Sequence, residues 1–272
     1  MGNGNQPYQG SSYQERTFSI GSEEEQSLHD ACGIDSSIFS GCIDPAAFVG
    51  IGIQEAVRND IPIVGALNTR QELALLRPVR YAEPLTVCGG IATAERTDRG
   101  EVIVIEVSLL DASGATVLKS TEHMLRRSAA DEPGSSAPAA RRPSEEPAAP
   151  TTTKEIGQAQ FTPESVRASS GKSVNPVHTD PAAARKAGFR VPIAGGAQSV
   201  RYLTAEIWRQ FSPTCCQLDI RFKRPIFWDD RCQILVDERD GVWRTISLAR
   251  EGKAALEIRI ESLHSGPQRS PV

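Results

Sequence analysis

The sequence predicts an α+β protein made of two halves that share one order of elements. In each half a helical segment comes first and several strand-like segments follow it. A segment rich in proline and alanine separates the halves, and an Arg-Pro motif recurs at corresponding places in both. Consecutive strands after a helix favour an antiparallel sheet packed against that helix.

The composition excludes several classes of protein. The 272 residues are 39% hydrophobic and 24% charged, which is typical of a globular chain. A net charge of −4 with scattered Lys and Arg predicts no nucleic-acid partner. No apolar run approaches the roughly 20 residues of a membrane-spanning helix, and the polar N-terminus lacks a signal pattern. We therefore expect no membrane partner and a cytoplasmic location.

Cysteine and histidine spacing predicts neither disulfides nor a metal site. The six cysteines form no Cys-x-x-Cys pair, and the chain is too large to need covalent staples, so reduced thiols are expected. None of the four histidines has a Cys, His or carboxylate partner at zinc spacing.

The first half is predicted to begin after a disordered tail. Residues 1–22 are polar and lack periodicity, and a domain is expected over 23–127. Asp44-Pro45 predicts a helix start, with the helix running to about Arg58 despite Gly50 and Gly52. The expected strands are 72–79, 85–95, 102–110 and 116–125, with glycine-containing turns between them.

The second half follows a linker. Residues 128–157 are rich in Pro, Ala and Ser and are expected to connect to a domain at 158–265, with a short tail at 266–272. A helix beginning at Gly196 is the strongest helical prediction, because apolar residues recur every three or four positions. The expected strands are 217–227, 232–237, 242–249 and 254–263.

A weak internal repeat supports duplication. Arg77-Pro78 and Arg224-Pro225 both come late in the first long strand after a helix, at an offset of 147 residues (224 − 77). The same offset places the helix of the first half on the region that opens at Gly195.

Residues 170–199 hold the strongest candidate site. The imidazole of His178 titrates near neutral pH, so it can take up and return a proton. Gly195 and Gly196 open a predicted helix, whose first N–H groups and positive dipole end favour a polarised carbonyl oxygen. This pairing suits chemistry beside an acyl group.

A series of residues in this stretch follows a known signature, Ser-Gly-Asp-x-Asn-Pro-x-His-x-Asp, then Gly-Phe, Pro-Ile and a glycine that opens the central helix. The matching residues are Ser170, Gly171, Asn175, Pro176, His178, Asp180, Gly188, Phe189, Pro192, Ile193 and Gly196. The chain thus resembles the MaoC-like, or R-specific enoyl-CoA hydratase, family. The resemblance implies a double hot dog, in which two antiparallel sheets each wrap around a central helix and pack as a pseudo-dimer.

The resemblance also implies roles for individual residues. In the family, an aspartate and the histidine act on a water that adds to C3 of an enoyl thioester, and a proton returns to C2. Here Ser173 stands in place of that aspartate. His178 is the implied acid/base, Asn175 shapes the site, and the Gly196 N–H is the oxyanion donor.

Other residues complete the predicted set. Ser173 is a candidate to orient the water and Lys172 a candidate acid, while Asp180 and Glu164 are candidates to replace the missing carboxylate. Asp180 before a proline equally predicts a helix N-cap. Gly195, Ser199 and Gly50 are the remaining predicted substrate-binding residues; Gly50, with Gly52, would leave room for an acyl chain.

Three functions remain open at this point. The first is a hydro-lyase that hydrates or dehydrates the β-position of an enoyl or 3-hydroxyacyl thioester held by CoA or an acyl-carrier protein, with no further cofactor. The second is a repurposed enzyme, an isomerase or cyclase, and the third is an inactive binding subunit. A monomeric pseudo-dimer and a homodimer are both consistent with the sequence.

Overall fold

The computed structural model describes residues 8–63, 65–98, 100–126, 153–170 and 175–265. The first half contains β1 (Arg16–Phe18), α1 (Ser22–Cys32), η1 (Ser36–Phe39), η2 (Pro45–Phe48), α2 (Ile51–Arg58), β2 (Leu67–Leu75), β3 (Leu85–Thr97), β4 (Gly100–Leu110) and β5 (Thr116–Arg126). The second half contains β6 (Thr153–Gln160), α3 (Pro163–Ser170), η4 (Pro176–His178), α4 (Pro181–Lys186), α5 (Gly196–Phe211), β7 (Pro213–Phe222), β8 (Arg231–Arg239), β9 (Val242–Arg250) and β10 (Lys253–Ser265).

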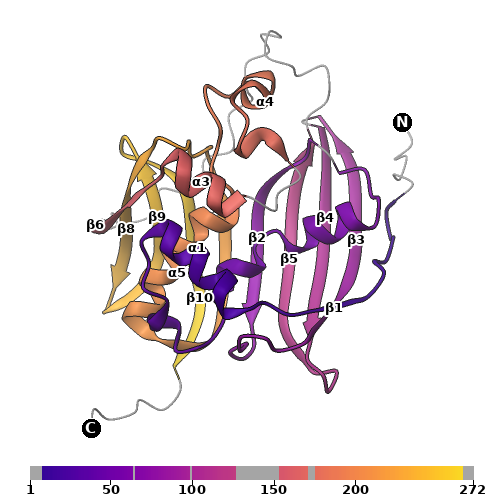
Figure 1. The fold of residues 1–272 in the computed structure, drawn as a ribbon, viewed down its shortest axis with the longest axis horizontal. Helices are drawn as coiled ribbons and strands as arrows, with labels where there is room; N and C mark the ends of the chain where they lie inside the picture. The colour runs from indigo at the N-terminus through magenta and orange to yellow at the C-terminus, as the bar shows by residue number, and fades with distance from the viewer. Residues whose placement is uncertain (1–7, 64, 99, 127–152, 171–174, 266–272) are drawn as a thin grey trace.

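The strands form a single ten-stranded antiparallel sheet in the order β1-β3-β4-β5-β2-β7-β10-β9-β8-β6. β2 and β7 pair at the centre of the sheet (Figure 1). Outward from them lie β5, β4, β3 and β1 of the first half on one side, and β10, β9, β8 and β6 of the second half on the other. This pairing joins the two halves through backbone hydrogen bonds.

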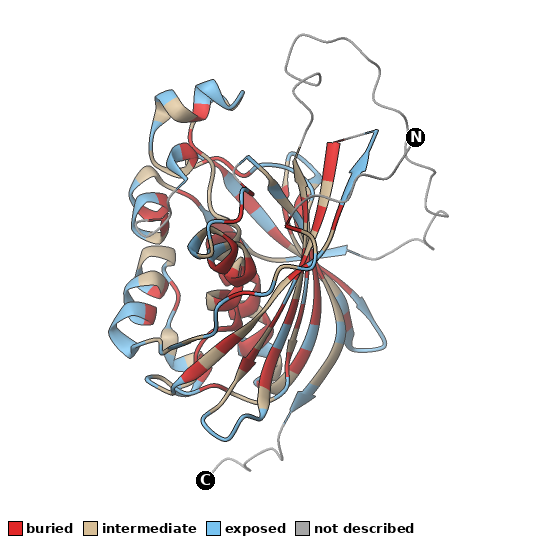
Figure 2. Cartoon of the chain, turned by 90° about the vertical axis from the view of Figure 1, so that its right-hand side faces the viewer, coloured by how far each residue is buried: buried red, intermediate tan, exposed pale blue. Residues whose placement is uncertain are grey.

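The helices lie on one side of this sheet. Figure 2 shows α5 largely buried between the sheet and the outer helices. Ten of its residues are buried, including Val200, Leu203 and Ile207 of the predicted apolar face. Burial of one long apolar helix against a curved sheet supplies the core of this half. The shorter α2 occupies the corresponding place in the first half.

The internal repeat is visible in the positions of the two central strands. β2 ends at Leu75 and β7 ends at Phe222, and Arg77-Pro78 and Arg224-Pro225 follow these ends at the same spacing. The motif therefore lies just beyond each strand rather than within it, as expected for a proline that has no N–H for a sheet ladder.

The predicted helix over residues 44–58 is divided in two. Asp44 does cap a turn with Pro45 at its start, but η2 ends at Phe48 and α2 begins at Ile51. Val49 is extended and Gly50 has a φ of 78°, a left-handed conformation that glycine adopts without strain. The glycine that weakened the helix prediction thus marks the break.

Two elements lie in segments that the sequence assigned to a tail and a linker. The tail prediction covered residues 1–22, yet Tyr8 and Tyr13 are buried and β1 pairs with β3. The linker prediction covered 128–157, yet β6 begins at Thr153 and pairs with β8. Edge strands with few apolar residues give a weak alternation pattern, so the sequence alone does not predict β1 or β6. The rest of the predicted linker lies outside the described residues.

No helix within the described ranges is both long enough and apolar enough to cross a membrane. All six cysteines are free thiols, as the spacing predicted.

Candidate functional site

His178 lies at the end of η4, a single turn that Asn175 caps by accepting the Val177 N–H at 3.2 Å. The His178 Nδ1 is 2.9 Å from the carbonyl oxygen of Ile193. Because a carbonyl only accepts, Nδ1 carries the proton and Nε2 keeps its lone pair. Burial lowers the pKa of His178, and the bond to Ile193 opposes part of that effect. The ring is therefore held as a neutral base.

The helix α5 begins beside this segment with an open N-terminus. Gly195 is its N-cap residue and has no side chain to cap with. Among the described residues, none accepts a hydrogen bond from the N–H groups of Gly196, Ala197 or Gln198. Such unpaired N–H groups, at the positive end of a 16-residue helix, favour an oxygen that carries partial negative charge.

Gly196, the first residue of α5, lies against side chains from both halves of the chain. A Cβ added there would lie 3.0 Å from the Phe222 ring and 3.6 Å from Val49. Phe222 comes from β7, whereas Val49 comes from the first half. Both halves of the chain therefore border the start of α5.

The helix of the first half has a different N-terminus. There the buried carboxylate of Glu122 accepts the N–H groups of Gly52 and Ile53 at 2.9 and 3.0 Å. Glu122 pairs with Gln71 across β5 and β2, and the corresponding pair across β10 and β7 is Ile260 with Leu218. An isoleucine thus takes the place of the carboxylate in the second half. The start of α2 is closed by Glu122, whereas no described residue closes the start of α5.

The two glycines of the first half have different surroundings. A Cβ on Gly52 would lie 2.6 Å from Ile105, so this glycine allows helix and sheet to approach each other rather than leaving room for a ligand. Gly50 donates its N–H to Gln71 at 3.1 Å, and among the described residues only Ile53 comes within 4.0 Å of a Cβ added to it.

The remaining predicted residues fall into three groups. Ser199 donates its hydroxyl to the Gly195 carbonyl at 3.1 Å, so it stabilises the first turn of α5. Asp180 accepts the Ala182 N–H at 2.7 Å, which confirms the N-cap interpretation, and Glu164 is exposed on α3. Ser173 and Lys172 lie outside the described residues.

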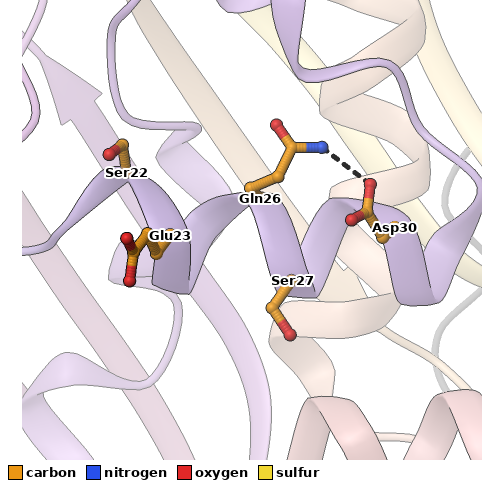
Figure 3. A pocket seen from close by; sticks show the side chains of 5 residues that line it. All are labelled: Ser22, Glu23, Gln26, Ser27 and Asp30. Carbon is orange, nitrogen blue, oxygen red and sulfur yellow. Dashed lines mark hydrogen bonds between the residues drawn. The ribbon is translucent and has the colours of Figure 1, made fainter.

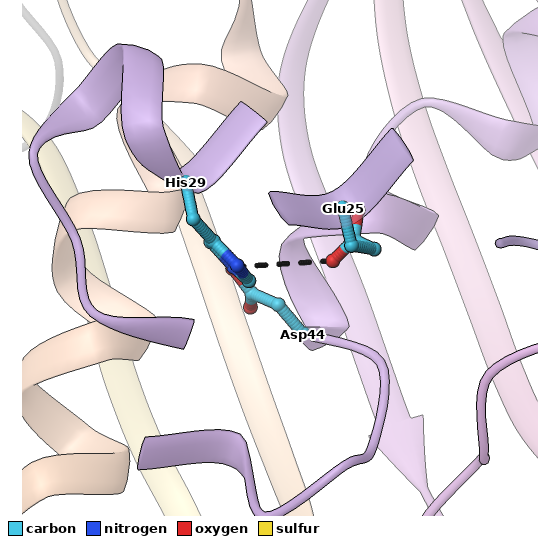
Figure 4. A group of neighbouring side chains, drawn as sticks. All are labelled: Glu25, His29 and Asp44. Carbon is cyan, nitrogen blue, oxygen red and sulfur yellow. Dashed lines mark hydrogen bonds and ion pairs between the residues drawn. The ribbon is translucent and has the colours of Figure 1, made fainter. Parts of the chain in front are cut away.

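A buried group of charges was not predicted from the sequence. Glu25 and His29 of α1 meet Asp44 (Figure 4). Arg201 of α5 lies 3.2 Å from Glu25 and 3.1 Å from Asp44. The ligand atoms of Glu25, His29 and Asp44 lie within 4.8 Å of one another, close enough to hold a metal ion. The guanidinium already supplies positive charge to the same carboxylate oxygens, so the group is better explained as an ion-pair network.

A shallow hollow lies on the surface of α1 (Figure 3). Its lining residues are Ser22, Glu23, Gln26, Ser27 and Asp30, all polar and all from one helix. It lacks the apolar walls that an acyl chain requires.

Part of the chain is similar to a known domain family. Residues 141–255 match the MaoC like domain. Over 184 residues the chain is 27% identical to 3-hydroxyacyl-thioester dehydratase X of Mycobacterium tuberculosis, an alignment that covers 66% of this chain and 62% of that protein. The chain thus spans less than two thirds of that relative's length.

Solved structures show the same architecture. The crystal structure of HtdX from Mycobacterium tuberculosis superposes with a TM-score of 0.69 at 18% identity, covering 91% of this chain and 99% of the other. Another protein of that organism, described as a double hot dog, gives a TM-score of 0.61 at 13% identity, covering 93% and 97%. The fold is therefore a double hot dog, as the resemblance implied. The stretch that matches the MaoC like domain, residues 141–255, contains both His178 and Gly196.

Proposed function

We propose that this protein is a hydro-lyase that hydrates or dehydrates the β-position of an enoyl or 3-hydroxyacyl thioester. One observation carries the proposal: in the MaoC-like half, the Nδ1 of His178 is bonded to the carbonyl of Ile193, which lies three residues before a helix N-terminus that nothing among the described residues caps. The dehydratase name of the relative from Mycobacterium tuberculosis supports the same reaction class.

In the hydration direction, the Gly196 N–H binds the thioester carbonyl oxygen. The neutral Nε2 of His178 takes a proton from a water as the water oxygen bonds to C3. The electron pair of the C2–C3 double bond then moves towards the carbonyl, giving an enolate at the start of α5. The imidazolium returns a proton to C2, which completes the addition of one water. Dehydration is the reverse.

The low pKa of His178 suits the first of these steps. Burial keeps the ring neutral near neutral pH, so the base form is present before the water arrives. Bonding of Nδ1 to Ile193 also stabilises the imidazolium that forms, because Nδ1 remains a donor throughout. Ser173 is proposed to orient the water where the family has an aspartate.

Replacing His178 tests the proposal. We expect His178→Ala to lower water addition to crotonyl-CoA, or to a longer enoyl-CoA, by about 10²- to 10⁴-fold, since it removes the proton-transfer group. His123→Ala is the matched control, because His123 lies on the outer face of β5 beside Glu72. If the unmodified protein hydrates neither thioester, or if His178→Ala keeps full activity, the proposal fails.

Ser173 motivates a second candidate function. Without the family's aspartate, the site would suit an isomerase or cyclase that needs no water, or a binding subunit that pairs with an active relative. Ser173→Asp separates these possibilities. A large gain in hydration would indicate a weakened hydratase, loss of a native isomerisation would indicate new chemistry, and no change would favour the binding subunit.

The proposed substrate is a thioester of CoA or of an acyl-carrier protein, with no other cofactor. The cytoplasmic location, and the choice between monomer and homodimer, stay predictions of the sequence.

A further inference from the structure

A buried carboxylate, Asp230, closes the turn between β7 and β8. It is 7% exposed, and its Oδ2 accepts the Phe227 N–H at 2.7 Å while its own N–H returns to the Phe227 carbonyl at 3.0 Å. Its Oδ1 accepts Arg190 Nη2 at 2.9 Å, and its Oδ2 also accepts Arg250. One side chain thus ties together a turn, the loop before α5 and strand β9.

The turn held by Asp230 runs beside the segment that anchors the histidine. Ile193 lies directly opposite Phe227 in an antiparallel bridge. On either side of this pair, Ala194 donates to the Ile226 carbonyl at 2.8 Å and Trp228 donates to the Pro192 carbonyl at 3.1 Å. The only backbone support of the Ile193 region within the described residues, apart from a longer bond to Val177 at 3.3 Å, comes from this turn.

Arg190 reinforces the same contact from the other segment. It lies three residues before Ile193, and its guanidinium packs 4.2 Å from the centre of the Phe227 ring. Arg190 and Phe227 therefore both bond to Asp230 and also touch each other. Loss of the carboxylate would leave two neighbouring guanidinium groups without the anion between them.

We propose that Asp230 is a positioning residue for His178: with Arg190 and Arg250 it fixes the Ile193 carbonyl that holds the proton on Nδ1 and leaves Nε2 free for chemistry. Asp230 touches neither the substrate nor the imidazole in this role. It acts through the turn, the bridge and the carbonyl. The role rests on the proposed function, since it assigns a purpose to the tautomer of the proposed base.

The test uses Asp230→Asn, which keeps an acceptor for the Phe227 N–H but removes the charge. With an enoyl-CoA as substrate, we expect kcat to fall by about tenfold or more while KM stays within about twofold. Displacing the base by a fraction of an ångström slows proton transfer but leaves substrate binding nearly unchanged. The ¹⁵N spectrum of the ring should show part of His178 moving its proton from Nδ1 to Nε2. With four histidines in the chain, His178→Ala identifies the signal.

Asp229→Asn is the matched control. Asp229 is the neighbouring carboxylate and pairs with the same Arg190, at 2.6 and 2.7 Å, but it lies on the surface. Within the described residues, its side chain accepts no hydrogen bond from Ile226, Phe227 or Trp228. It should leave both kcat and the tautomer unchanged. If Asp230→Asn does not fold, Arg250→Gln removes one bond to Asp230 and should shift both readings in the same direction by a smaller factor.

The tautomer measurement needs no substrate, so it stands even if the protein proves not to be a hydratase. The proposal is overturned if a folded Asp230→Asn variant keeps the Nδ1–H tautomer, if its KM rises while kcat is unchanged, or if Asp229→Asn has an equal effect.

Discussion

Glu122 is the residue that most clearly distinguishes the two halves. It is fully buried and accepts two N–H groups at the start of α2, whereas the corresponding position in the second half is Ile260. A carboxylate in this place satisfies the helix from within. A single side chain therefore accounts for the lack of an open helix N-terminus in the first half.

Burial of Glu122 makes the free energy of unfolding depend on pH. Desolvation raises its pKa from 4.5 to about 7, although the two backbone bonds oppose the rise. Because the folded pKa exceeds the unfolded one, its contribution to stability is complete below about pH 4.5 and is lost as the pH rises through 7, at most about 3 kcal/mol. We expect the free energy of unfolding to decline between pH 5 and 7, and Glu122→Gln to flatten that decline.

Urea unfolding at several pH values measures this effect. Glu106→Gln is the control, since Glu106 is exposed on the neighbouring strand β4 and should leave the pH dependence as it is. If Glu122→Gln has the same pH dependence as the unmodified protein, Glu122 is not protonated in the folded state over this range.

At the scale of elements, the start of α5 depends on Gly196 being without a side chain. A Cβ at this position would press on the Phe222 ring at 3.0 Å. We expect Gly196→Ala to lower kcat/KM with an enoyl-CoA by about tenfold or more, because the ring or the helix must move and the N–H then leaves the place of the oxyanion.

Two further variants test the cause. Phe222→Leu combined with Gly196→Ala should restore part of the rate, because leucine lacks the ring atoms that clash. Gly157→Ala in β6 is the control, since its Cβ would meet Ile234 at 3.7 Å, an ordinary contact distance. A Gly196→Ala variant with wild-type kinetics would show that the start of α5 tolerates a side chain and does not grip the substrate.

At the scale of the whole molecule, the buried charge network joins α1 and η2 of the first half to α5 of the second. Arg201 is 3% exposed, and Asp44 also accepts the Thr204 hydroxyl at 2.8 Å. α1 itself packs on α3 and α5, so the first half of the chain covers the helix of the second half (Figure 1). The charge network and the β2–β7 pairing together hold the two halves against each other.

Removing Arg201 tests this connection. We expect Arg201→Met to lower the free energy of unfolding by about 3–5 kcal/mol, because Glu25 and Asp44 would be buried without a counter-charge. Arg209→Met on the exposed side of the same helix, where Arg209 pairs with Glu206, should cost less than about 1 kcal/mol. Equal losses in urea unfolding would mean that the buried network adds nothing.

The sequence by itself determined those features that are local or repeat with a period. The apolar spacing from Val200 to Phe211 predicted α5, the alternating segments predicted eight of the ten strands, and the Asn-Pro-x-His signature selected His178. Each of these features can be predicted because residues close together in the sequence produce its pattern. The edge strands β1 and β6 were missed because their apolar residues are few.

Only the tertiary structure decided what the site can do. The carbonyl that sets the His178 tautomer is 15 residues away, Glu122 reaches the start of α2 across 70 residues, and Arg201 meets Glu25 across 176. Such contacts form where distant parts of the chain meet in the fold, and the spacing of residues along the sequence does not predict them. Hydrogen bonds and buried charges act over a few ångströms in space, so their partners appear only when the fold brings them together.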